Sequence, residues 1–194
     1  MNFLPNLQSF RILLASKSPR RRELLQKLGI PFEVIGLDVD ESYPADLPTE
    51  AIPLYLARLK AQPFRAGIDR KTLVITADTI VSVEGQVLGK PRDNDEARSM
   101  LQSLSGRWHT VSTGVFLLSE QKELGFTSET RVRFKELSAY EIDHYIEEYK
   151  PFDKAGAYGI QEWIGYVAVE RIEGSYFNVI GLPVQRLYEA LLDF

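Results

Sequence analysis

A cluster of cationic side chains near the start of the chain is the first feature that could do chemistry. Its members are Lys17, Arg20, Arg21 and Arg22. They follow the apolar run Arg11–Ala15, which predicts a strand, and they open a predicted helix with Ser18 as N-cap and Pro19 as first residue. Arginines in a first helical turn are disfavoured by the helix dipole unless an anion lies there. The pattern therefore predicts a phosphate site at the helix N-terminus. Its ligands would be Ser16, Ser18, Arg20 and Arg21. A capped helix with solvated arginines is the alternative.

Asp78 is the second feature, because it lies inside the mostly apolar run Leu73–Val83. An unpaired buried charge costs several kcal/mol, so a carboxylate in a predicted buried strand requires a reason. Buried carboxylates with charged partners are concentrated at active sites. We therefore expect Asp78 to bind a metal or to orient a water molecule. The structural alternative is an aspartate held by a backbone N–H group or by a lysine.

The acidic segment Asp38–Ser42 is the third feature, with carboxylates at Asp38, Asp40 and Glu41 that could form part of a divalent-cation site. An apolar run followed by such a segment also resembles the first motif of haloacid-dehalogenase-type phosphatases, in which the first aspartate is a nucleophile. Here Gly36 interrupts the run just before Asp38. An exposed acidic loop is therefore favoured over that nucleophile.

Three lysines occur in turn-like or cleft-compatible settings and together could neutralise a triphosphate: Lys60, Lys90 and Lys154. The run Ala157–Gln161 could contact a base, because the Gln161 amide offers both a hydrogen-bond donor and an acceptor. Solvated lysines and an ordinary loop are the structural alternatives.

These side chains must be positioned by alternating strands and helices. The predicted strands are Arg11–Ala15, Phe32–Ile35, Leu73–Val83, Thr110–Leu118, Gly125–Phe134, Tyr166–Arg171 and Phe177–Ile180. The predicted helices begin near Ser18, Thr49, Asp93 or Asn94, Ser138 and Pro183, and Ser138 with Glu141 forms a capping box. The pattern predicts an α/β fold with a mixed central sheet and helices on both sides. We expect a tail over residues 1–10 and a single domain over residues 11–194, whose middle third could form a second lobe across a central cleft.

Composition limits the classes of function. The 194 residues contain no cysteine, which excludes disulfides and cysteine-based zinc sites, and only two histidines. Any metal should then be a hard cation bound by carboxylates and phosphates. The net charge of −4 argues against a nucleic-acid-binding protein. There is no apolar run of about 20 residues and no secretory signal in residues 1–10, so we expect a cytoplasmic protein without a membrane anchor.

Taken in order, eight segments resemble the Maf family of nucleotide pyrophosphatases. They are Ala15–Leu25, Val39–Glu41, Ala77–Val81, Gly89–Pro91, Leu104–His109, Thr113–Val115, Asp153–Gln161 and Gly174–Pro183. The resemblance implies that Asp78 is the general base on water, and that Glu41 and Asp78 bind a divalent cation, Mg²⁺ or Mn²⁺. It also implies that Lys60, Lys90, Arg20 and Arg21 face the phosphates. The family's fold is similar to that of inosine-triphosphate pyrophosphatases, and its members are commonly homodimers.

Three positions indicate the subgroup: Arg20, Thr79 and Gln161. This combination resembles the branch that hydrolyses dTTP and UTP, whereas the 7-methylguanosine-triphosphate branch has Trp, Gln and Glu there. We therefore expect a small-molecule triphosphate as substrate, modified pyrimidine nucleotides included, with monophosphate and pyrophosphate as products. The cellular role would be house-cleaning or division arrest. One alternative is a nucleotide-binding regulator of cell division with incidental hydrolysis. The other is a phosphatase that uses Asp38 and releases inorganic phosphate.

Overall fold

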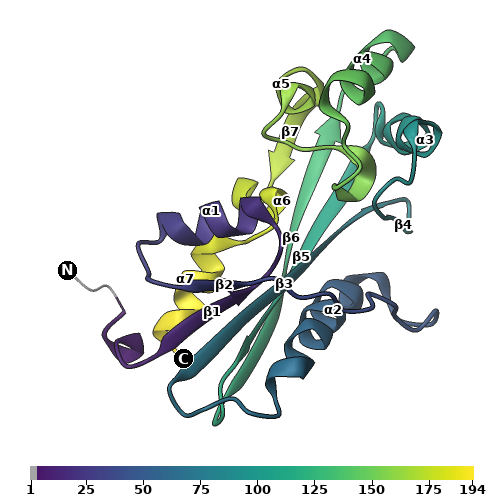
Figure 1. The fold of residues 1–194 in the computed structure, drawn as a ribbon. Helices are drawn as coiled ribbons and strands as arrows, with labels where there is room; N and C mark the ends of the chain where they lie inside the picture. The colour runs from purple at the N-terminus through teal and green to yellow at the C-terminus, as the bar shows by residue number, and fades with distance from the viewer. Residues whose placement is uncertain (1–3) are drawn as a thin grey trace. The chain divides into compact units, whose positions relative to one another are not determined.

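The structure, a computed structural model, describes residues 4–194 and contains a mixed seven-stranded sheet (Figure 1). The strands are β1 (Arg11–Ala15), β2 (Glu33–Ile35), β3 (Thr72–Val83), β4 (Gln86–Leu88), β5 (Trp108–Leu118), β6 (Glu123–Phe134) and β7 (Val169–Glu173). Their order is β2-β1-β3-β5-β6-β7, and β4 pairs with β3. β1 is parallel to β2 and β3, whereas the pairs β3–β4 and β6–β7 are antiparallel. The predicted α/β class with a mixed sheet is confirmed.

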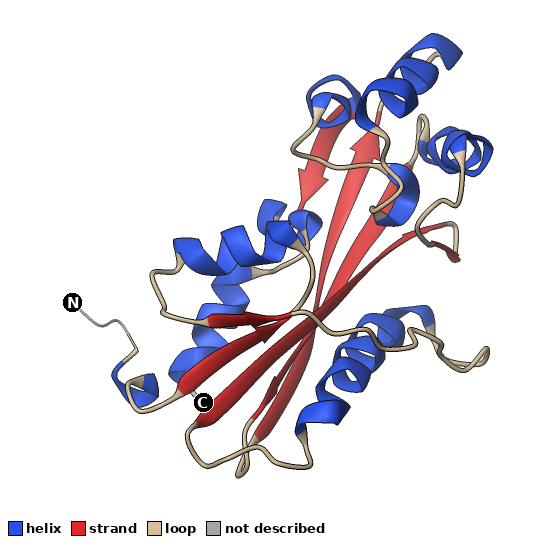
Figure 2. Ribbon diagram, viewed as in Figure 1, coloured by secondary structure: helices blue, strands red, loops and turns tan. Residues whose placement is uncertain are grey.

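The helices, drawn in blue in Figure 2, are distributed over two compact units of the chain. They are α1 (Pro19–Lys27), α2 (Ile52–Ala61), α3 (Asn94–Leu104), α4 (Ala139–Tyr149), α5 (Trp163–Ala168), α6 (Tyr176–Ile180) and α7 (Val184–Leu192). The first unit comprises the chain up to Asp78 with Thr113–Ser128 and Gly181–Phe194. The second unit comprises Thr79–Ser112 and Glu129–Ile180. The single domain and the central cleft expected from the sequence stay predictions.

In the first unit, one face of the strands packs against α2. Leu13 of β1 is in register with Val74 of β3, and both belong to a buried cluster with Phe116 of β5 and with Ala57 and Ala61 of α2. The two alanines carry no side chain beyond Cβ, so the helix can lie close to the sheet. In Figure 1, α1 and α7 lie on the other side of these strands, which confirms helices on both sides of the sheet.

The closest approach between α2 and the sheet is at Gly114 of β5. A Cβ atom added there would lie 2.2 Å from the carbonyl carbon of Pro53 and 2.3 Å from the amide nitrogen of Leu54. No side chain fits between these backbone atoms, which explains the glycine of the Thr113–Val115 segment. The contact fixes the first turn of the helix that carries Lys60 in its last turn.

In the second unit, local capping signals place α3 and α4. The Asp93 side chain accepts a hydrogen bond from the Glu96 N–H group at 2.9 Å, so Asp93 caps α3. Ser138 and Glu141 form the predicted capping box of α4. The two-residue turn between β3 and β4 has positive φ at Glu84 and Gly85, as a type I′ hairpin turn requires.

One predicted strand begins three residues late, and another is wrong. The segment predicted as a strand over Tyr166–Arg171 begins in helix α5 and only then continues into β7, and Phe177–Ile180 lies in helix α6. Short apolar runs fit a strand or a buried helix equally well, so contacts elsewhere decide. For α6 the deciding residue is Asn178, which is fully buried and donates hydrogen bonds from Nδ2 to the Val111 carbonyl at 3.0 Å and to Thr130 Oγ1 at 3.1 Å.

The segment predicted as an N-terminal tail contains a short 3₁₀ helix, Pro5–Leu7. Leu4 and Leu7 are buried, and the Asn6 side chain donates a hydrogen bond to the Leu191 carbonyl at 2.8 Å. Residues 4–10 are therefore tied to α7, while residues 1–3 of the predicted tail lie outside the described part of the chain.

Candidate active site

The structure brings Asp78, Lys60 and Glu41 together in the first unit. The Lys60 ammonium lies 2.5 Å from Asp78 Oδ1 and 2.9 Å from Glu41 Oε1. Asp78 is buried in β3, with only 7% of its surface exposed, so the ammonium supplies the partner that its charge requires. Two carboxylates from distant parts of the sequence thus converge on one cation.

The predicted phosphate site begins α1 in the same unit. Ser18 caps the helix, because its Oγ accepts a hydrogen bond from the Arg21 N–H group at 3.4 Å. Ser16 is buried, and its Oγ accepts a hydrogen bond from the Ser18 N–H group at 3.2 Å. Both predicted serines therefore lie at the helix start, where each hydroxyl oxygen accepts a hydrogen bond from a backbone N–H group and each O–H group can still donate to an anion.

Arg21 connects the helix start with the carboxylates. Its Nε donates a hydrogen bond to the Gly181 carbonyl at 2.8 Å, which fixes the guanidinium group. Burial lowers the pKa of Arg21, and the positive charge of the nearby Arg20 lowers it further. The negative charges of Asp78 and Glu41 act in the opposite direction and raise it. The charges of the Asp78–Lys60–Glu41 cluster therefore act on the Arg21 guanidinium group, which places the helix start in the same electrostatic environment.

The other two acidic residues of the 38–42 segment are engaged elsewhere. Asp38 is paired with Lys17, and 90% of its side chain is exposed. Asp40 accepts hydrogen bonds from the Ser42 N–H group at 3.1 Å and from the Ser42 hydroxyl at 3.2 Å, which is a local turn. Asp38 thus has neither the burial nor the strand end that a phosphatase nucleophile would use.

Across residues 4–194, no three histidine, aspartate or glutamate side chains gather in a way that could bind a metal ion. Within the predicted site, the carboxylates that converge on one cation are Asp78 and Glu41. Carboxylate oxygens are the ligands that Mg²⁺ prefers, and this ion commonly takes one or two carboxylates together with substrate phosphates. The pair fits such an ion, because both carboxylates already reach a single positive charge.

The remaining predicted site residues belong to the second unit. Thr79 follows Asp78 along β3, and Lys90 is exposed beside Gly89. The segment that leads to Gln161 is joined to this region, because the Gly156 N–H group donates a hydrogen bond to the Gly89 carbonyl at 3.0 Å. Gln161 itself is exposed in a turn, which the Glu162 N–H group closes by donating to the Gly159 carbonyl at 2.9 Å.

Lys154 is the third lysine of the predicted phosphate-binding set, and like Lys60 it contacts two carboxylates. Its side chain is only 9% exposed and pairs with Asp153 at 2.7 Å and with Glu162 at 3.0 Å. It is therefore committed to ion pairs within the second unit.

Two buried tyrosines lie in or beside the Gln161 segment. The sequence singled out Tyr158, as part of the run Ala157–Gln161, but not Tyr145. Tyr145 of α4 is fully buried and hydrogen bonded to Gly159 and Glu162. Tyr158 is buried, and its hydroxyl lies 2.8 Å from Nε2 of His109. The buried position of Tyr145 on its helix predicts only a core residue, so no signal in the sequence pointed to its hydroxyl group.

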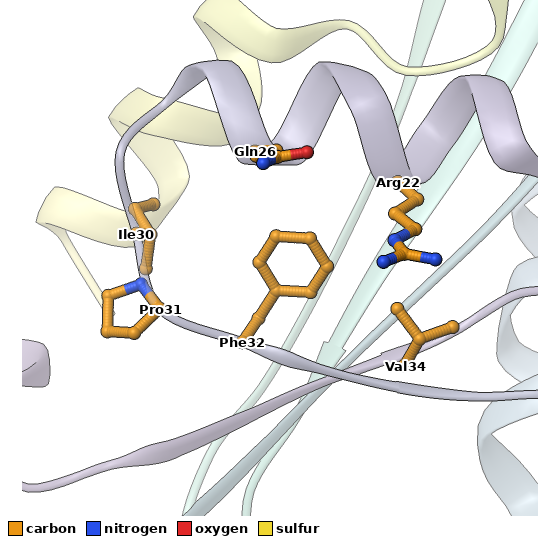
Figure 3. Close-up of a pocket in the computed structure, with 6 residues that line it drawn as sticks. All are labelled: Arg22, Gln26, Ile30, Pro31, Phe32 and Val34. Atoms are coloured by element: carbon orange, nitrogen blue, oxygen red, sulfur yellow. The ribbon is translucent and has the colours of Figure 1, made fainter.

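A cavity of about 410 Å³ lies between α1 and the segment that leads into β2 (Figure 3). It is lined by Arg22, Gln26, Ile30, Pro31, Phe32 and Val34. None of the predicted site residues lines it.

Within residues 4–194, no helix is long and apolar enough to cross a membrane.

Comparison with known proteins identifies the class. Residues 11–194 match the family described as Maf-like protein, so the chain belongs to the Maf family, and the resemblance seen in the sequence is confirmed. A dTTP/UTP pyrophosphatase of Porphyromonas gingivalis is 53% identical, with 98% of each chain covered. A dTTP/UTP pyrophosphatase of Phocaeicola vulgatus is 55% identical, with 97% of this chain and 98% of the relative covered.

Among solved structures, the Staphylococcus aureus Ham1 protein matches with a TM-score of 0.48 at 14% identity, covering 64% of this chain and 71% of that one. This likeness is too weak to carry an argument about the fold.

Proposed function

We propose that this protein is a nucleotide pyrophosphatase that hydrolyses dTTP and UTP to the monophosphate and pyrophosphate. The observation that carries the proposal is the convergence of Asp78 and Glu41 on Lys60, with Arg21 in the same electrostatic environment. The dTTP/UTP pyrophosphatases that resemble this chain over nearly their whole length support the same substrate class.

In the proposed reaction, Asp78 accepts a proton from the water molecule that attacks the α-phosphorus. A bond forms between the water oxygen and the α-phosphorus, the bond from this phosphorus to the bridging α–β oxygen breaks, and pyrophosphate leaves. No covalent enzyme intermediate is needed. Phosphoryl-type transition states are stabilised mainly by positioning and by charge neutralisation. Lys60, Arg20, Arg21 and Lys90 are the groups proposed to neutralise the phosphates.

A divalent cation, Mg²⁺ or Mn²⁺, is proposed to bind at Asp78 and Glu41, where it would supply further charge neutralisation on the phosphates. The hydroxyl groups of Ser16 and Ser18 are proposed to donate hydrogen bonds to phosphate oxygens at the positive end of the α1 dipole. Arg20, Thr79 and Gln161 are proposed to select the pyrimidine nucleotide. The Gln161 amide can donate to the O4 atom and accept from the N3–H group of uracil or thymine.

Asp78→Asn tests the role of the general base. We expect the variant to keep its fold and its nucleotide binding and to lose at least about 100-fold in kcat for dTTP, because proton transfer by a positioned group contributes about that much or more. Near-wild-type hydrolysis by this variant would rule out the role. Turnover and products are measured on a panel of dTTP, UTP, CTP, 5-methyl-UTP, pseudo-UTP and 7-methyl-GTP. A strong preference for 7-methyl-GTP would overturn the assigned subgroup.

Asp38→Asn is the matched control, because Asp38 is exposed and paired with Lys17 outside the site. The pyrophosphatase proposal predicts unchanged activity with pyrophosphate as product. A phosphatase that uses Asp38 predicts the opposite, namely loss of activity in this variant and release of inorganic phosphate by the wild type.

A division phenotype that persists with Asp78→Asn would favour the regulator over the enzyme as the cellular role. Cytoplasmic location and a homodimer stay predictions.

A further inference from the structure

The turn that carries Gln161 is held by contacts at every residue except Gln161. The Gly159 N–H group donates a hydrogen bond to the Tyr145 hydroxyl at 3.0 Å. Ile160 is buried, with 7% of its surface exposed. The carboxylate of Glu162 accepts hydrogen bonds from Tyr145 and Lys154. Only the third residue of the turn, Gln161, directs an exposed side chain outward.

The Tyr145 hydroxyl contacts both ends of this turn with a single oxygen atom. It accepts the hydrogen bond from Gly159 and donates its own proton to Glu162 Oε2, so its capacity as both acceptor and donor is used. Burial, and then the hydrogen bond to Glu162, raise the pKa of Tyr145, so the hydroxyl keeps the proton that it donates. The ring is fully buried on α4, which fixes the oxygen in place.

Close packing leaves the turn little room to move. A Cβ atom at Gly159 would lie 3.0 Å from Glu162 Cδ and 3.0 Å from Lys154 Cε. One at Gly165 would lie 1.9 Å from the Ile160 carbonyl oxygen. These two glycines therefore allow the turn to close tightly, and the hydrogen bonds of Tyr145 select its position.

We infer that Tyr145 is a positioning residue for base recognition: its hydroxyl fixes the turn Gly159–Glu162 and thereby places the Gln161 amide for the nucleotide base. This inference rests on the proposed function. It predicts that loss of the hydroxyl weakens substrate binding through Gln161 and leaves the chemical step at Asp78 largely intact.

Tyr145→Phe removes the hydroxyl and keeps the buried ring. Loss of a buried hydrogen bond of ordinary strength corresponds to about a fivefold rise in KM for dTTP, with kcat changed by less than about twofold. In a Gln161→Ala background, Tyr145→Phe should raise KM no further, because the residue acts through Gln161. Tyr149→Phe is the matched control, since Tyr149 stacks on Tyr145 at 5.1 Å and is 38% exposed; its KM should equal that of the wild type.

An unchanged KM in folded Tyr145→Phe, or effects of Tyr145→Phe and Gln161→Ala that multiply in the double variant, would overturn the inference. If circular dichroism shows that Tyr145→Phe does not fold, KM for dTTP is measured for Glu162→Ala instead. This variant removes the carboxylate that accepts the Tyr145 hydrogen bond, so the same rise in KM is expected. Wild-type hydrolysis of dTTP with release of pyrophosphate tests the proposed function separately, since the inference is judged only by the ratio of variant to wild-type KM.

Discussion

Replacing Gly114 by alanine tests the contact that sets the position of α2. The added Cβ would lie 2.2 Å, 2.3 Å and 2.4 Å from backbone atoms of Pro53 and Leu54, whereas ordinary contact begins at 3.4 Å. To relieve the clash, the first turn of α2 would have to move by about 1 Å, against a core in which the helix is already close-packed. Gly114 does not have a positive φ, so the effect comes from the contact and not from backbone strain.

The expected loss of stability depends on the kind of atom that the added Cβ contacts. Overpacking that side chains can absorb costs about 1–3 kcal/mol. Backbone atoms in a helix cannot rotate away, so we expect Gly114→Ala to lose about 3 kcal/mol or more of the free energy of unfolding. This is a large share of the roughly 5–15 kcal/mol that stabilises a typical domain.

Urea denaturation followed by circular dichroism measures this loss, with two matched glycines as controls. At Gly125 the added Cβ would meet the ends of the Leu54 and Phe116 side chains at 2.8 Å and 2.9 Å, so we expect about 1–2 kcal/mol. At Gly89 nothing lies within 4 Å, and the change should stay within about 0.5 kcal/mol. If Gly114→Ala were as stable as Gly89→Ala, the argument from close approach would be refuted.

Three further perturbations address the capping box, the buried histidine and the site lysine. Glu141→Gln should cost about 1 kcal/mol near neutral pH. The hydrogen bond from Lys135 and those from the N-cap residue lower the pKa of Glu141 to about 2, so this stability is present above the unfolded pKa of about 4.3 and is lost as the pH falls toward 2. Urea midpoints that differ equally at neutral and at acid pH would contradict this. Burial lowers the pKa of His109 to about 3, so the wild type should lose stability as the pH falls from about 6.5 toward 3. His109→Gln should flatten that part of the profile, and an unchanged slope would show that another group is responsible. Lys60→Gln should lower kcat/KM for dTTP by about 100-fold, whereas the surface control Lys71→Gln should leave it unchanged. A kcat/KM of Lys60→Gln within about twofold of wild type would exclude the proposed role of Lys60.

Local signals in the sequence predicted the helix starts. Ser18, Asp93 and the pair Ser138 and Glu141 cap the helices that they were expected to cap. A cap acts on N–H groups two or three residues away, so nearly all of its physics is present in a short stretch of sequence. The strand β3 with its buried aspartate was predicted for a similar reason, because its apolar run is long.

Contacts between distant residues could not be predicted in the same way. The sequence indicates that Asp78 needs a partner, but it does not identify Lys60, which the packing of α2 on the sheet places there. The helix α6 was taken for a strand, because the hydrogen bonds of buried Asn178 depend on residues far away along the chain. The resemblance to the Maf family supplied the pairing of Glu41 with Asp78, which spacing alone did not.

In the turn around Gln161, the residues that stabilise the backbone conformation differ from the residue that is free to be substituted. Gly159, Ile160 and Glu162 are held by the interior of the second unit, whereas the Gln161 side chain makes no contribution to closing the turn. A different side chain at this position would be presented on the same backbone without refolding its surroundings. Under the proposed role of Gln161, the contribution of this position to base preference could be redesigned by changing one exposed side chain, with the fold around it left intact.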